Sequence, residues 1–202
     1  MMTDNSLIFL SKSGSEIEPD KKEAFRYMGY KSDCSDEMLE ELYDECNAEY
    51  KKAASYKAVM KKADITLKED NVIDFGFCEI KNENLYKNLS GCDSVYIFAA
   101  TSGVAVDRLI MRYSKLSPAK AMVCDSIGSS AIEVWCDEVN DKISSFGKTK
   151  SRFSPGYGGV SLEYQKDILN FLDAEKRLGI TLSDSFMMIP AKSVTAFVGI
   201  RK

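Results

Sequence analysis

The stretch SVYIFAATSGVAVDRLIMRYSKLSP, residues 94–118, indicates the fold class of this chain. Its first seven residues form a continuous apolar run, which is typical of a strand that is covered on both faces. Thr101-Ser102-Gly103 predicts a turn after that strand, followed by a helix over 104–113. Ser117-Pro118 predicts the start of a second helix, because serine caps a helix and proline fits its first turn. A buried strand that leads into two successive helices favours a fold in which helices and strands are mixed.

Working outward, the hydrophobic periodicity predicts further elements on both sides of this stretch. Residues 1–20 are expected to form a polar, poorly ordered leader before one domain over residues 21–202. The pattern lacks the regular βαβ alternation of a doubly wound sheet, so we expect an α+β domain with a twisted, mainly antiparallel sheet and several flanking helices. Helices are predicted over 21–29, from 35 to about 60, over 82–89, from 118 to about 146 and over 161–178, and strands over 72–80, 180–189 and 193–200.

Composition narrows the possible functions. The 202 residues include 27 basic and 31 acidic side chains, a net charge of −4, and the sequence pI is about 5.1. That balance argues against nucleic-acid binding, which favours a clustered basic face. No apolar run approaches the ~18 residues of a membrane span, and the first twenty residues do not read as a signal peptide. We therefore expect a cytoplasmic protein.

The chain contains no histidine. This excludes Ser–His–Asp and Cys–His catalysis, histidine-ligated haem or zinc, and imidazole acid–base chemistry. No two of the six cysteines are closer than twelve positions, so zinc-ribbon and iron–sulfur spacings are absent and no metal site is predicted. Cys46, Cys124 and Cys136 fall in apolar helical patterns, and we expect inert, reduced thiols there.

The loop RFSPGYGG, residues 152–159, is the best candidate for a ligand site. Its glycines let a ligand approach the backbone, and Arg152 can bind a carboxylate with two hydrogen bonds. Tyr157 adds a ring and a hydroxyl group. The alternative interpretation is a tight surface turn before the next helix.

Three other features carry weaker signals. Asp125 and Glu133 lie two turns apart on one predicted helix, so they project from nearly the same side. A carboxylate at 133 among apolar neighbours would need a cationic partner if it were buried; otherwise it is an ordinary exposed glutamate. Thr101-Ser102-Gly103 follows a buried strand, where open sheets present ligand crevices. Arg108, Arg112 and Lys115 form a basic stripe, which is either a solvated face or a dock for an acidic protein.

RFSPGYGG, the helix SLEYQKDILNFL and the segment GITLSDSFMMIPAKSVTAFVGI together resemble the activation domain of vitamin B12-dependent methionine synthase, in its free-standing bacterial form. The earlier stretches EAFRYMGY and 95–141 also resemble that family. The resemblance covers about residues 21–200 and rests mainly on the combination of the RxSPGY element with the SDSFMMxPxKSV element.

The resemblance implies a function. Members of the family bind S-adenosylmethionine (AdoMet) and support reductive remethylation of cob(II)alamin, with a flavodoxin-type protein as the electron donor. Cobalt is the nucleophile, so the domain needs no catalytic side chain and acts by positioning. The resemblance assigns the AdoMet carboxylate to Arg152 and the AdoMet amino group to Glu133. It also places Ser154, Pro155, Gly156, Tyr157 and Gly158 at the ligand, and Tyr157, Met187, Met188, Lys192 and Ser193 on the surface facing cobalamin.

The sequence also departs from the family pattern. The C-terminal extension of the large synthases is missing, and the family's N-terminal aspartate contact has no evident counterpart. The DxHxxG signature of a cobalamin-binding module is absent. We therefore expect a subunit that acts in trans on a cobalamin-binding methionine synthase or another corrinoid protein. The alternatives are a non-catalytic docking protein and an activator of a different corrinoid methyltransferase.

Overall fold

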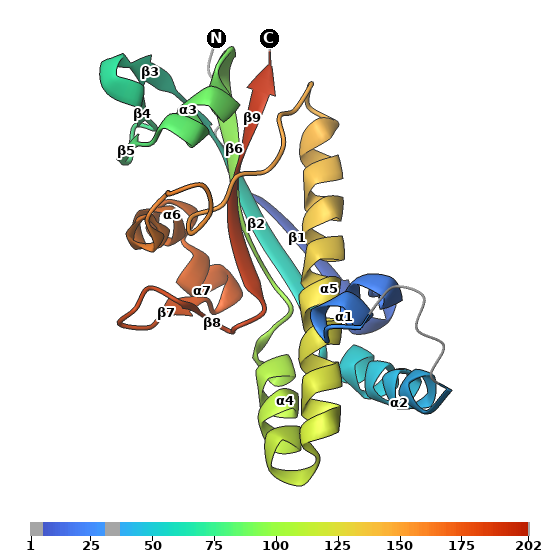
Figure 1. Cartoon of the computed structure of the whole chain (residues 1–202). Helices are drawn as coiled ribbons and strands as arrows, with labels where there is room; N and C mark the ends of the chain where they lie inside the picture. Colours follow the sequence, from blue (N-terminus) through green and yellow to red (C-terminus); the bar gives the residue numbers. More distant parts are fainter. Residues whose placement is uncertain (1–5, 31–36, 202) are drawn as a thin grey trace.

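The computed structural model describes residues 6–30 and 37–201. Its centre is a four-stranded antiparallel sheet in the order β1-β2-β6-β9 (Figure 1). The chain enters this sheet at one edge strand and ends in the other, so both ends of the described chain build the same layer. The four strands are β1 (Ile8–Ser13), β2 (Ser55–Asp64), β6 (Cys92–Thr101) and β9 (Ser193–Arg201).

The longest helix, α5, runs along one face of the sheet and contacts β6 and β9, and three further helices pack against α5 (Figure 1). The side chain of Ser117 accepts a hydrogen bond from the backbone N–H of Lys120, and Pro118 is the first helical residue. These are the capping and proline preferences of a helix N-terminus. The four helices are α1 (Lys21–Tyr27), α2 (Glu37–Ala53), α4 (Val104–Leu116) and α5 (Pro118–Ser144).

The opposite face is covered by shorter elements. A small sheet leads into α3, and two short helices lead into a two-stranded hairpin (Figure 1). These elements are β3 (Thr66–Lys68), β4 (Val72–Asp74), β5 (Glu79–Lys81), α3 (Glu83–Leu89), α6 (Gln165–Leu172), α7 (Ala174–Leu178), β7 (Thr181–Leu182) and β8 (Met188–Ile189), with 3-10 turns at Glu69–Asn71 and Leu162–Tyr164. Another 3-10 turn, Gly14–Glu16, follows β1 and packs against α2.

The sheet separates two hydrophobic cores because successive side chains of a strand point to opposite faces. In β6, Tyr96 and Phe98 belong to the core under α5, whereas Val95 and Ile97 belong to the core under α6. The prediction that this strand is covered on both faces is therefore confirmed, as is the α+β class. Among the described residues, no helix combines the length and apolarity needed to cross a membrane.

The structure corrects two expectations in the N-terminal third. Residues 8–17 are not a poorly ordered leader: β1 pairs with β2 along its whole length, and Ile17 is buried. The helix predicted to reach Met60 ends at Ala53, and β2 begins at Ser55. The hydrophobic pattern of lysine-rich β2 fits neither a helix nor a strand clearly. Its pairing with β1 and β6 decides that it is a strand. The cap predicted at Ser35 lies outside the described residues.

Three more expectations are corrected in detail. The strand predicted over 72–80 is two short strands, because the chain turns back between Asp74 and Glu79. The strand predicted over 180–189 is likewise the hairpin β7–β8. The helix predicted over 161–178 is interrupted at Asp173, which adopts a left-handed conformation with φ of 52°.

Candidate functional site

The candidate loop lies along the outer edge of β9. Two backbone hydrogen bonds join Phe153 and Phe197 at 3.0 and 2.8 Å, and the N–H of Lys150 donates to the carbonyl oxygen of Gly199 at 2.9 Å. Phe153 is buried. The loop is therefore held to the main sheet as a short additional strand, which fixes the position of Arg152 next to it.

The glycines fold the loop into a compact turn. Gly156, Gly158 and Gly159 all have positive φ, the region that favours glycine. The N–H of Gly156 donates to the carbonyl of Val160 at 2.8 Å, and the N–H of Tyr157 donates to the carbonyl of Ser154 at 3.2 Å. These two N–H groups are used within the turn and are not available to ligand oxygens. The loop presents side chains instead.

Arg152 and Glu133, predicted to act together, are in direct contact. One guanidinium nitrogen, Nη2, lies 3.0 Å from Glu133 Oε2 and 3.0 Å from Asp137 Oδ1. The Arg152 side chain is 23% exposed, while the two carboxylates on α5 are 49% and 70% exposed. The other terminal nitrogen, Nη1, is buried without a hydrogen-bond partner. A buried donor of this kind favours an additional acceptor.

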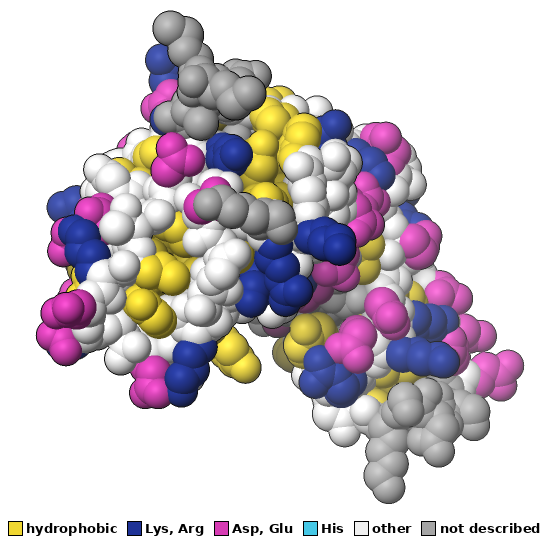
Figure 2. All heavy atoms as spheres, turned by 90° about the horizontal axis from the view of Figure 1, so that it is seen from above, with side chains coloured by type: hydrophobic (Ala, Val, Ile, Leu, Met, Phe, Trp, Pro, Cys, Tyr) yellow, Lys and Arg dark blue, Asp and Glu magenta, His cyan; other side chains and the backbone are white. Residues whose placement is uncertain are grey.

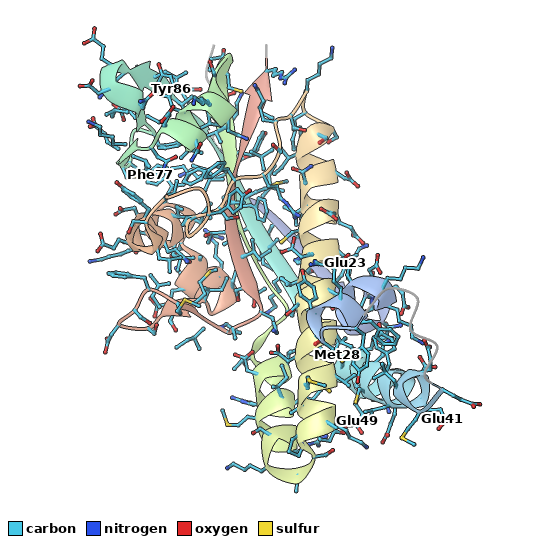
Figure 3. All side chains as sticks on the ribbon, viewed as in Figure 1. Glu23, Met28, Glu41, Glu49, Phe77 and Tyr86 are labelled. Atoms are coloured by element: carbon cyan, nitrogen blue, oxygen red, sulfur yellow. The ribbon has the colours of Figure 1, made fainter. Side chains whose placement is uncertain are left out.

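An acidic hollow adjoins this ion-pair cluster. It has a volume of about 300 Å³ and lies between α1 and α5. Glu23 projects from α1 beside α5 (Figure 3). Viewed from above, basic side chains gather near the centre of the face, next to a recessed acidic group (Figure 2). The lining residues are Asp20, Glu23, Tyr27, Ser130, Glu133, Val134 and Asp137.

Sequence reasoning missed three acids of this hollow, Asp20, Glu23 and Asp137. Asp20 caps α1 by accepting hydrogen bonds from the N–H groups of Lys22 and Glu23, and Ser130 Oγ donates to the Asp20 carbonyl at 2.8 Å. Asp137 follows Glu133 by one helical turn, and that spacing was the available signal. The position of Asp20 depends on contact between segments 110 residues apart, so no local pattern reveals it.

A second, open hollow lies on the other side of the loop. It has a volume of about 880 Å³, and Arg152 contributes to its wall. Tyr157 is 71% exposed here, and its ring packs edge-on against Phe153 with 5.6 Å between centroids. Arg152 thus lies between an acidic hollow and an aromatic one. The second hollow is lined by Asn84, Lys87, Asn88, Ser151, Arg152, Phe153, Tyr157 and Gly158.

The residues predicted to face cobalamin divide into two groups. Met187 is 57% exposed and Met188 is half-buried. Lys192 instead turns inward, where its amine lies 2.8 Å from Asp125 and 2.9 Å from Ser129. Ser193 is buried and donates to Thr101. Lys192 and Ser193 are therefore unsuited to a surface that faces a partner.

Asp125 and Glu133 have different cationic partners, Lys192 and Arg152. The two carboxylates lie on the same helix, yet Asp125 holds the segment before β9 and Glu133 holds Arg152. Thr101-Ser102-Gly103, the other weak candidate, forms hydrogen bonds within the turn and to the Lys192 carbonyl. Asp125 and the turn at residues 101–103 therefore both have structural roles.

The basic stripe on α4 is interrupted. Arg112 Nη2 lies 2.7 Å from Glu49 on α2, so its charge is partly neutralised. Arg108 and Lys115 are exposed and have no ion pair among the described residues. The stripe therefore presents two separated cations to solvent.

The cysteines provide no reactive thiol at the site. Burial raises the pKa of Cys136, which lies on the buried face of α5, and burial raises the pKa of Cys78 to about 12. A hydrogen bond between Cys46 and Cys124 lowers the pKa of the former and raises that of the latter, and both residues are buried. A thiol that stays protonated is a poor nucleophile. Cys34 lies outside the described residues.

Comparison with solved structures first identifies the fold. The chain is similar to a crystal structure of the MetH reactivation domain bound to AdoHcy, with a TM-score of 0.73 and 14% identity. The similarity covers 96% of this chain and 78% of that chain. The chain therefore has the fold of a methionine synthase reactivation domain.

A family model also matches the C-terminal part of the sequence. Residues 140–201, from the end of α5 through β9, match the model of the vitamin B12-dependent methionine synthase activation domain. The resemblance to that domain is thus found in the fold of nearly the whole chain and in the sequence of its C-terminal part. No curated protein sequence matches the chain significantly.

Proposed function

We propose that this chain binds AdoMet and supports reductive remethylation of cob(II)alamin on a separate cobalamin-dependent methionine synthase. In that reaction one electron reduces cob(II)alamin to cob(I)alamin. The AdoMet methyl group then moves to cobalt, and S-adenosylhomocysteine (AdoHcy) leaves. The chain itself contributes positioning, for which no catalytic side chain is needed.

The observation that carries the proposal is the cluster of Arg152 with two carboxylates of α5. The amino acid end of AdoMet bears a carboxylate and an ammonium group. The carboxylate fits the guanidinium, whose Nη1 has no partner, because arginine can bind a carboxylate with two parallel hydrogen bonds. The ammonium group fits the adjoining acidic hollow, where Glu133 lies with Asp137 and Asp20. Tyr157 and the turn from Ser154 through Gly158 would contact the remainder of the ligand.

Exposed side chains of the loop and of the β7–β8 hairpin suggest where the corrinoid protein docks. Tyr157, Met187 and Ile189 are exposed, and exposed apolar side chains are typical of interaction surfaces. We assign Tyr157, Met187 and Met188 to the surface that faces cobalamin. A flavodoxin-type protein would supply the electron. A soluble, cytoplasmic complex acting in trans is the arrangement we favour.

A methyl-transfer assay tests this function. The purified chain is mixed with AdoMet, titanium(III) citrate and a cob(II)alamin-loaded methionine synthase that lacks its own activation domain. We expect the methylcobalamin absorption spectrum to appear only when the chain is present, and to be lost with Arg152→Ala. No methylcobalamin, despite binding of the chain to the synthase, would favour the non-catalytic docking protein. Methylation of a different corrinoid protein alone would favour the other activator.

A further inference from the structure

Three amide side chains of the α3 segment hold the candidate ligand loop. Nδ2 of Asn82 and Nδ2 of Asn84 both donate to the carbonyl oxygen of Gly158, each at 3.0 Å. Nδ2 of Asn88 donates to the carbonyl oxygen of Ser151 at 3.2 Å. These contacts join two segments that are more than 60 residues apart in the sequence, with sequence separations of 63 to 76. The two bonded carbonyls flank Arg152 and Tyr157 on either side.

The helix that carries these amides is itself fixed. Leu85 and Leu89 are fully buried in the core that also contains Phe153. The Asn82 side chain caps α3 by accepting a hydrogen bond from the N–H of Leu85 at 2.8 Å. One face of α3 is therefore anchored by apolar burial, and its start is fixed by the same asparagine that reaches the loop.

Gly158 is the point at which this arrangement has least freedom. Its φ is +55°, and an added Cβ would lie 2.6 Å from Phe153 Cζ and 3.4 Å from Asn84 Cβ. Because Gly158 has no side chain, the amides of Asn82 and Asn84 can both reach its carbonyl oxygen. Gly158 and Gly159 both adopt conformations that are accessible chiefly to glycine. The peptide of Gly158 would therefore rotate easily if the two amides did not hold its carbonyl.

We infer that Asn82, Asn84 and Asn88 are positioning residues, which hold the loop so that Arg152 and Tyr157 meet the ligand in one geometry. This inference rests on the proposed function for its ligand. Pre-ordering a loop raises affinity because less conformational freedom is lost when the ligand binds. The small sheet that precedes α3 then has a purpose at the site, since it supports the helix that orders the loop.

Asparagine-to-aspartate substitutions isolate the role of the amide donors. Asn82→Asp keeps an oxygen that can cap α3, but it replaces the donor to Gly158 with an acceptor. Asn84→Asp also replaces the donor to Gly158 with an acceptor, at an exposed position. Asn84→Ala removes that donor without adding charge. Asn170→Asp is the matched control, because Asn170 is exposed on α6. Each variant is measured for AdoMet affinity, for hydrogen exchange of residues 156–160 without ligand, and for its urea midpoint.

We expect Asn84→Ala to raise the dissociation constant for AdoMet about three- to tenfold, the usual effect of one lost hydrogen bond. Asn82→Asp is expected to have an equal or larger effect. Exchange of the loop amides should accelerate by at least about threefold, while the urea midpoint of Asn84→Ala stays at the wild-type value. Asn170→Asp should change none of the three.

Affinity and loop exchange that remain at the wild-type values in Asn82→Asp and Asn84→Ala would overturn the inference. If the wild-type chain fails to bind AdoMet, the proposed function fails, and loop exchange alone then decides. Faster exchange in the α3 variants would still support positioning of the loop, whereas unchanged exchange would overturn it.

Discussion

At the scale of single residues, the candidate site is an ion-pair cluster of one arginine and two carboxylates, and in the proposed function it receives a zwitterion. Arg152 is bonded to Glu133 and Asp137 at 3.0 Å each, and an arginine next to two carboxylates already has its charge compensated. A ligand carboxylate would add a third acceptor for the guanidinium, at Nη1, while a ligand ammonium group would reduce the repulsion between the two acids. The cluster is thus stable without ligand and complementary to it.

Replacing Arg152 with alanine tests the cation. We expect Arg152→Ala to weaken AdoMet binding by about 10- to 100-fold, because hydrogen bonds between charged groups contribute about 1.5–3 kcal/mol. The free energy of unfolding should change by less than about 1 kcal/mol, since both partner carboxylates remain accessible to water. Arg177→Ala is the control, because Arg177 lies on α7 and its ion pair is with Asp173, outside the candidate site. Equal affinities of the two variants, measured by calorimetry, would remove Arg152 from the site.

Glu133→Gln tests the contact to the ammonium group. The substitution keeps the shape of the side chain but removes its charge. Affinity for AdoMet should therefore fall more than affinity for an analogue that lacks the amino group. Asp137→Asn shows whether the second acid shares this role. Parallel losses for both ligands in competition binding would contradict an ammonium contact at Glu133.

At the scale of elements, the N-terminal strand is part of the fold and is fixed by a tight turn. Gly14 follows β1, and a Cβ at this position would lie 2.0 Å from the backbone carbonyl oxygen of Lys51 and 2.9 Å from that of Ala54. The turn between β1 and α1 therefore packs directly against the end of α2. No residue larger than glycine fits there without movement of backbone.

Gly14→Ala should consequently destabilise the protein by at least about 1–3 kcal/mol, the usual cost of overpacking. Ser11→Ala, at an exposed position of β1, should change the stability by less than about 0.5 kcal/mol. Urea unfolding of both variants checks this. Wild-type stability of Gly14→Ala would mean that β1 and its turn contribute little to the native structure.

The sequence predicted those elements whose signals are local. The apolar run in β6 and the Ser117-Pro118 start of α5 needed no distant information. β2 was missed because SYKAVMKKAD has no clear period, and only its pairing with β1 and β6 makes it a strand. At the site, the pairing of Arg152 with Glu133 came from the family resemblance. Asp20 and the α3 asparagines lay beyond prediction, since distant segments bring them to the loop.

At the scale of the whole molecule, the absence of histidine shapes the response to pH. Several carboxyl groups have lowered pKa values: Glu18 through its hydrogen bond from Lys51, Glu49 through one from Tyr113, and Asp74 through one from Lys68. A group with a lowered pKa in the folded state stabilises that state above its unfolded pKa. The stabilisation is lost as the pH falls through the folded pKa.

We therefore expect stability to decrease below about pH 4.5, near the ordinary pKa of glutamate, and to be level from about pH 5.5 to 7.5. Urea unfolding at several pH values measures this, and Glu49→Gln should reduce the loss in acid. A change of more than about 1 kcal/mol between pH 5.5 and 7.5 would show that a group with a strongly shifted pKa has been overlooked.

The central claim is that the Arg152 cluster binds AdoMet, and calorimetric titration of the purified chain with AdoMet tests it most directly. ATP serves as the control, because it shares the adenosine group but lacks the amino acid end. We predict saturable binding of AdoMet with one site per chain, and no comparable binding of ATP. An absence of AdoMet binding, or equal binding of both ligands, would contradict the assignment of a zwitterion site to Arg152 and Glu133.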